Sequence, residues 1–153
     1  MTQKAIIIPE LSDFPKLAPC PVSGHQWGDG LLVRTPNWLG DAVMTFPALA
    51  MLKKSLPATC GLFIACPKGL APLFDEMEEA GQVIPLENAH AFPNASERYT
   101  FRELHPGATL LFNNSFRDAI ALKLLGSRHL YGVKARHRSF LLKSKWSLPK
   151  RRN

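Results

Sequence analysis

The residues of this chain that could do chemistry gather in two short stretches, each directly after an apolar run. The first stretch holds Asn37 and Asp41, and the second holds Asn114, Ser115 and Arg117. One carboxylate, several neutral hydrogen-bonding groups and a guanidinium suit a polyhydroxylated, anionic ligand. If the fold brings the two stretches together, they predict a crevice that binds such a ligand.

Asp41 lies where an apolar run and a Pro-Asn turn give way to helical periodicity, so residues 31–44 are typical of a strand, a loop and a helix that open a βαβ unit. Its carboxylate either caps the first free N–H groups of the helix, which contributes roughly 1 kcal/mol, or points into a cleft. Gly40 before it lets the backbone pass close to a neighbour or a ligand. The spacing alone leaves both roles of Asp41 open.

The elements that must position these residues alternate along the chain, which predicts a Rossmann-like, doubly wound α/β fold with a mostly parallel sheet. We expect strands near residues 31–34, 61–66, 82–86, 108–112 and 129–133, and helices near 41–55, 69–80 and 116–125, whereas residues 87–107 are expected to be a polar loop region with one helical turn around 96–104. The helix over 41–55 should turn Phe46, Leu49, Leu52 and Leu56 toward the sheet and should either kink at Pro47 or begin near Phe46. The last helix should turn Phe116, Ile120 and Leu124 inward and stop at Gly126.

A strand order of 3-2-1-4-5 would place the loops after the first and fourth strands on either side of one crevice. Residues 35–40 contain one glycine where the dinucleotide fingerprint needs three, and the chain has no Walker A lysine motif. The predicted Rossmann-like domain is therefore not expected to bind a nucleotide.

The charge is unevenly distributed: residues 119–153 hold ten basic side chains and no acidic one, whereas residues 1–118 carry a slight acidic excess. The basic segment points to an anionic partner or is simply a solvated tail. Phe140 and Trp146 are the only aromatic residues near the basic run and no known motif frames them, so nucleic acid is not an expected partner. The acidic cluster at residues 75–79 is expected to be a solvated face.

The cysteines and apolar runs bear on the environment of the protein. Cys20, Cys60 and Cys66 are odd in number and form no CxxC pair, which favours buried thiols in a reducing compartment over a metal site. No apolar run has the length of a membrane helix, and residues 5–9 are better explained as a strand than as a signal peptide. We expect a cytoplasmic protein that could lie at the cytoplasmic face of the inner membrane.

Three segments together resemble one known family. Residues 33–44, Val-Arg-Thr-Pro-Asn-Trp-Leu-Gly-Asp-Ala-Val-Met, followed by Phe-Pro-Ala-Leu at 46–49, closely resemble the N-terminal motif of the glycosyltransferase family 9 heptosyltransferases. Asn-Asn-Ser-Phe-Arg at 113–117 is similar to the second N-terminal motif of that family, particularly in its heptosyltransferase II type, and residues 131–142 resemble the stretch that follows. The segments occur in the family's order over about residues 30–145.

The resemblance implies a GT-B architecture, in which two Rossmann-like domains face a cleft. Residues 30–145 would be the acceptor-binding domain, residues 1–29 an irregular extension and residues 146–153 a basic tail, with the C-terminal donor domain absent. The implied reaction moves a heptose from ADP-heptose to the lipopolysaccharide inner core, with phosphorylated Kdo-lipid A as acceptor, inversion at the anomeric carbon, and no metal or other cofactor. The chain alone would be inactive; as an alternative, it would be a non-catalytic fragment that binds an anionic glycolipid or membrane surface through its basic segment.

The resemblance also implies roles for the site residues. Asp41 would be the general base, and Asn37, Gly40, Asn114 and Ser115 would contact the substrate, although Asn114 and Ser115 could equally cap their helix. Arg117 and Arg34 would either pair with phosphate or carboxylate groups of the acceptor or brace a loop or the surface.

Overall fold

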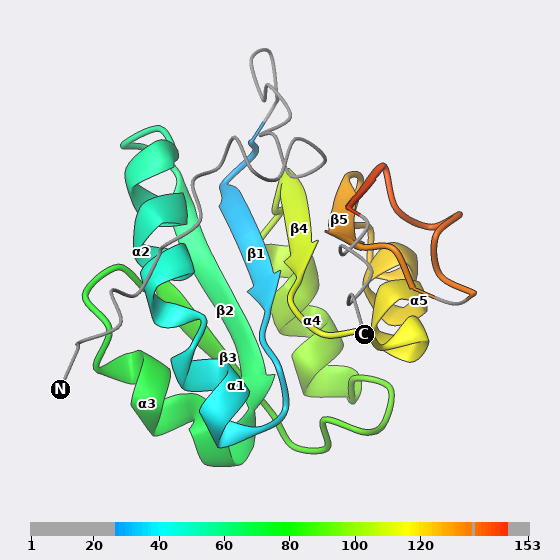
Figure 1. The fold of residues 1–153 in the computed structure, drawn as a ribbon, viewed down its shortest axis with the longest axis horizontal. Helices are drawn as coiled ribbons and strands as arrows, with labels where there is room; N and C mark the ends of the chain where they lie inside the picture. The colour runs from blue at the N-terminus through cyan, green and yellow to red at the C-terminus, as the bar shows by residue number, and fades with distance from the viewer. Residues whose placement is uncertain (1–26, 136, 147–153) are drawn as a thin grey trace, which may run out of the picture.

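The computed structural model describes residues 27–135 and 137–146, which build one parallel sheet with helices on both faces (Figure 1). The strands are β1 (Gly30–Arg34), β2 (Gly61–Pro67), β3 (Gln82–Leu86), β4 (Ala108–Leu111), β5 (Leu130–Val133) and β6 (Ser144–Trp146). Their order in the sheet is β3-β2-β1-β4-β5-β6, and every neighbouring pair is parallel. The predicted Rossmann-like fold is confirmed, its first five strands have the 3-2-1-4-5 order that was considered as a condition, and β6 adds an edge strand that the sequence pattern does not predict.

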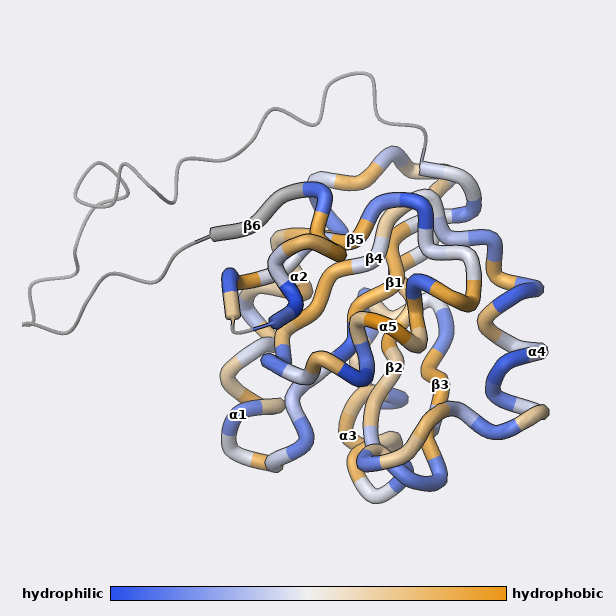
Figure 2. The backbone as a smooth tube through the Cα atoms, turned by 90° about the vertical axis from the view of Figure 1, so that its right-hand side faces the viewer, coloured by the Kyte–Doolittle hydropathy of each residue, from blue (hydrophilic) through white to orange (hydrophobic). Residues whose placement is uncertain are grey.

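Two layers of helices sandwich this sheet. The helices are α1 (Leu39–Val43), α2 (Phe46–Ser55), the 3-10 turn η3 (Lys68–Leu70), α3 (Ala71–Asp75), α4 (Ala95–Glu103) and α5 (Phe116–Leu124). Successive residues of β1 point to opposite faces: Leu31 and Val33 pack with α1, α2 and α3, whereas Leu32 packs with α4 and α5. Figure 2 shows the apolar strands between these layers. Both faces of the sheet are therefore buried, which explains why its strands are continuous apolar runs.

The segment that carries Asp41 folds as two helices. The expected helix over 41–55 is divided at Thr45 into α1 and α2, and Pro47 occupies the first turn of α2, where a missing N–H costs least. The alternative in which the helix proper begins near Phe46 is thus confirmed. Leu49 is fully buried, and the other residues of the predicted stripe pack against the same cluster.

The expected helix over 69–80 is too long, because α3 ends at Asp75. Turns then follow in which Met77 N–H donates to Phe74 O and Ala80 N–H donates to Met77 O. Gly81 N–H donates to Leu62 O of β2, so the chain must leave the helix early to pair β3 with the sheet. The acidic side chains at the end of this helix lie at the surface, as expected.

The predicted inward face of α5 is wrong. Phe116 and Leu124 are 38% and 74% exposed, and Ile120 is only half-buried. The buried residues of this helix are Asp118, Ala119, Ala121 and Leu122. The end of the helix is as predicted, since Gly126 has a φ of +99° and Ser127 N–H donates back to Leu122 O.

Some expectations fall on parts of the chain that the structure leaves undescribed: the strand over 5–9, Cys20 and most of the basic tail. Within the described part, none of the helices is long and apolar enough to cross a membrane. The same residues contain no group of three or more His, Cys, Asp or Glu side chains that could hold a metal ion.

Candidate functional site

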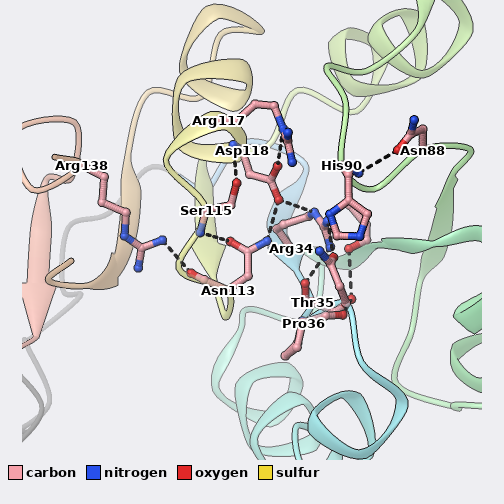
Figure 3. Close-up of polar contacts among 12 residues, drawn as sticks. Arg34, Thr35, Pro36, Asn88, His90, Asn113, Ser115, Arg117, Asp118 and Arg138 are labelled. Carbon is pink, nitrogen blue, oxygen red and sulfur yellow. Dashed lines mark hydrogen bonds and ion pairs between the residues drawn. The ribbon is translucent and has the colours of Figure 1, made fainter. Parts of the chain in front are cut away.

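The loops after β1 and β4 meet through one buried ion pair (Figure 3). Arg34, the last residue of β1, is 2% exposed, and its Nε lies 2.9 Å from Oδ2 of Asp118 in the first turn of α5. Its other nitrogens donate to Thr35 O and to Oδ1 of Asn37, each at 2.7 Å. Burial lowers the pKa of Arg34, and the neighbouring Asp118 carboxylate opposes that shift. Of the two roles considered for Arg34, the structure shows the bracing of a loop.

Asn113, Ser115 and Asp118 bond to one another where α5 begins. Asn113 Nδ2 donates to Oδ2 of Asp118 at 2.6 Å, and Asn113 Oδ1 accepts from the backbone N–H of Ser115. Ser115 Oγ accepts from the backbone N–H of Asp118 at 3.1 Å, so Ser115 is the N-cap of α5. The capping role predicted as one alternative for Ser115 is thus shown, whereas Asn114 is exposed beside it.

A second buried guanidinium joins the loop after β4 to the loop after β5. Arg138 is fully buried and donates to Asn113 O at 2.6 Å and to Oδ1 of Asn114 at 3.2 Å. It also donates twice to Val133 O, at 2.7 and 3.2 Å. Burial lowers the pKa of Arg138, and the Asp118 carboxylate opposes the shift. One member of the basic segment is therefore part of the interior and of the site.

Arg117 gives the site an excess of positive charge. Its Nε lies 4.0 Å from Oδ1 of Asp118 and is, among the described residues, the one buried side-chain polar atom without a hydrogen-bond partner. The side chain as a whole is 36% exposed, so its outer atoms reach solvent. The guanidiniums of Arg34 and Arg117 thus both lie within 4.0 Å of the Asp118 carboxylate, and Arg138 bonds to the neighbouring loop. An anionic ligand would balance the remaining charge.

Asp41 lies in the first turn of α1 and is exposed. The N-cap interpretation of Asp41 is wrong, because Trp38 occupies the N-cap position and no side chain caps the helix. Within the described part of the chain, no hydrogen bond or ion pair engages its carboxylate. Gly40 is exposed too, and apart from its chain neighbours and the backbone of its own helix no atom lies within 4 Å of the place a Cβ would take, so the expected close approach to a neighbour is not found. The space beside Gly40 and Asp41 is open.

The sequence missed three residues that organise the site: Asn113, Asp118 and Arg138. Asp118 had a local signal, since a serine three residues before an acidic side chain is typical of a helix N-terminus. Arg138 had none, because its acceptors Asn113 O and Asn114 Oδ1 lie in the loop after β4, far away in the sequence.

Comparison of this chain with known proteins indicates which proteins share its fold. No protein-family model and no curated protein matches the sequence. The structure of Escherichia coli ADP-heptose lipopolysaccharide heptosyltransferase II matches 78% of this chain with a TM-score of 0.66 and 26% sequence identity. The predicted resemblance is confirmed. The heptosyltransferase WaaC of Escherichia coli, solved with ADP, matches 80% with a TM-score of 0.66 and 16% identity.

A family 9 glycosyltransferase from Veillonella parvula DSM 2008 matches 80% of the chain with a TM-score of 0.65 and 15% identity. At such identities, this protein and WaaC support the fold alone. The chain spans 35% of the length of heptosyltransferase II and 42% of that of WaaC.

Proposed function

We propose that this chain is the acceptor-binding part of an inverting, metal-independent glycosyltransferase that moves a heptose from ADP-heptose to the lipopolysaccharide inner core. The observation that carries the proposal is the likeness to heptosyltransferase II, which extends over 78% of the chain at 26% identity. The positive excess around Asp118 supports it, since phosphorylated Kdo-lipid A is a polyhydroxylated, anionic acceptor. The nucleotide sugar would be bound by a further domain.

Asp41 is the proposed general base. An acceptor hydroxyl becomes acidic only as its bond to the anomeric carbon forms, so a carboxylate held within about 3 Å is sufficient to take the proton. The structure supports this role, because the Asp41 carboxylate is exposed and has no partner among the described residues. Gly40 beside it leaves the approach open.

Arg117 is the proposed contact for an acidic group of the acceptor. Its guanidinium is partly exposed, so a phosphate or carboxylate could accept hydrogen bonds from its outer nitrogens. The exposed amide of Asn114 and the half-buried amide of Asn37 can bond sugar hydroxyls. Arg34 is enclosed and would act on the ligand only through its charge.

Calorimetric titrations of the chain with ADP-heptose and, in parallel, with a de-acylated, phosphorylated Kdo-containing core test the proposal. We expect binding of the core alone. R117Q should weaken it, whereas R98Q, which removes an exposed arginine of α4, should not. Binding of ADP-heptose alone would mean that this domain is the donor side.

Asp41→Asn separates binding from chemistry. Because the general base acts as the bond forms, the variant should bind the Kdo-containing core as the wild type does. Transfer should be lost when the chain is joined to a donor-binding domain that gives measurable turnover. Near-normal transfer by D41N would remove Asp41 from the role of base.

A second candidate is binding to an anionic membrane or glycolipid surface through the basic segment. Lys123, Arg128, Lys134 and Lys143 are exposed, and residues 119–153 contain no acidic side chain. Sedimentation with vesicles should then need anionic lipid and decline with salt. Binding that ignores salt, or no binding, would count against this candidate.

A further inference from the structure

Asp118 is a buried carboxylate that joins the end of β1 to the loop after β4. Its side chain is 9% exposed, and one oxygen, Oδ2, lies 2.9 Å from Nε of Arg34 and 2.6 Å from Nδ2 of Asn113. Arg34 ends β1, and Asn113 lies in the loop between β4 and α5. Figure 3 shows Arg34 and Asn113 converging on Asp118 from these two elements.

The contacts continue from Arg34 and Asn113 toward the proposed reacting groups. Arg34 Nη2 donates to Oδ1 of Asn37, in the loop that leads into α1 and hence to Asp41. Asn113 Oδ1 accepts from the N–H of Ser115, the N-cap of the helix that carries Arg117. The Asp118 carboxylate thus connects the segment before the proposed base with the helix that bears the proposed anion contact.

We propose that Asp118 is a positioning residue that sets the spacing between the Asp41 side and the Arg117 side of the crevice. The inference rests on the proposed function, since that spacing matters when one acceptor must reach both side chains. Hydrogen bonds and ion pairs have direction, whereas apolar contacts hold their partners only by shape. A carboxylate between Arg34 and Asn113 therefore fixes both loops in a way that an apolar side chain of similar size would not.

The competing explanation is that Asp118 only neutralises the buried Arg34. A buried ion pair can often be replaced by apolar side chains of similar volume without loss of stability. If neutralisation were the whole role, removing both charges together should leave the loops and the binding of acceptor unchanged. The two explanations differ in the double variant R34M/D118L, and most clearly at residues 113–119, because R34M by itself also removes the donors to Thr35 O and Asn37 Oδ1.

The matched control is K68M/E87Q, which removes an ion pair outside the crevice. Lys68 Nζ lies 2.8 Å from Oε1 of Glu87, and the two side chains are 63% and 57% exposed. For both double variants, amide hydrogen exchange is measured without ligand over residues 35–42 and 113–119, together with calorimetric affinity for the phosphorylated Kdo-containing core. In R34M/D118L, exchange of both segments should become faster by about tenfold while the central strands stay protected. Affinity should fall about tenfold or more, because small displacements of binding groups are costly. The control should match the wild type.

Wild-type exchange and wild-type affinity in R34M/D118L would overturn the inference. If the wild type does not bind the core, the proposed function fails, and the exchange comparison still decides the positioning role. If R34M/D118L does not fold, the same measurements on D118N decide, because that variant keeps an acceptor for Asn113 and loses the charge facing Arg34. Faster exchange of both segments in D118N supports the inference, and unchanged exchange refutes it.

Discussion

Replacing Arg138 with methionine should destabilise the protein by about 2–4 kcal/mol, because the buried guanidinium holds two loops together. R138M keeps much of the aliphatic stem but leaves Asn113 O and Val133 O without their donors. Each unsatisfied, partly buried carbonyl costs about 1–3 kcal/mol. The amide of Asn114 is exposed and can turn to water, and the variant no longer desolvates a cation, which returns part of the loss.

Urea denaturation followed by circular dichroism measures this difference, and the melting temperature should fall by about 6–12 °C. The matched control is K143M, which removes an exposed cation of the same basic segment and should change stability by less than about 0.5 kcal/mol. If R138M and K143M are equally stable, Arg138 does not hold the loops and the segment is uniformly a solvated surface. A loss of stability confined to R138M would show that part of the positive charge belongs to the interior.

Three further predictions concern the core, a helix cap and a thiol. Leu49→Ala should cost about 2–5 kcal/mol in urea denaturation, because Leu49 is fully buried, whereas Met51→Ala on the same helix, 70% exposed, should cost little. Asn94→Ala should cost about 1 kcal/mol through loss of the capping box that Asn94 forms with Glu97 at the start of α4. Burial raises the pKa of the Cys66 thiol to about 12 from its ordinary value of 9.0, so the unfolded chain loses this proton first as pH rises. Between pH 9 and 12 the wild type should therefore lose up to about 1.4 kcal/mol per pH unit relative to C66A, and parallel stability curves would contradict this reasoning.

The sheet was predictable because its strands are buried on both faces. An apolar run such as residues 61–66, bounded by prolines, has few alternatives to a central strand, and the structure places β2 there. The alternation with helices predicted the parallel, doubly wound architecture, whereas the strand order was a condition that the structure then met. β6 escaped prediction because Ser144–Trp146 is short and polar, and its place at the sheet edge is fixed by pairing with β5.

The orientation of α5 was not predictable from its pattern. Hydrophobic periodicity assigns apolar residues to the core and charged ones to solvent, so it turned Phe116 and Leu124 inward. The structure buries Asp118 instead, because its partner Arg34 comes from a strand far away in the sequence. A pairing between distant residues leaves no periodic signal. The same limit applies to Arg138, which bonds to Asn113 and Asn114 in the distant loop after β4.

The buried charges of Arg34, Asp118 and Arg138 explain why hydrophobic periodicity failed to predict these parts of the structure, and they also shape the chemistry of the candidate site. Arg34 and Arg138 are enclosed, so salt screens their charges much less than those of exposed lysines. Asp118 is one carboxylate beside the two guanidiniums of Arg34 and Arg117, and the Nε of Arg117 has no hydrogen-bond partner. An acceptor phosphate at Arg117 would therefore meet a field that persists at moderate salt. Binding in the crevice should consequently depend less on ionic strength than binding of a membrane surface to the exposed basic residues, which separates the two candidate functions in one salt titration.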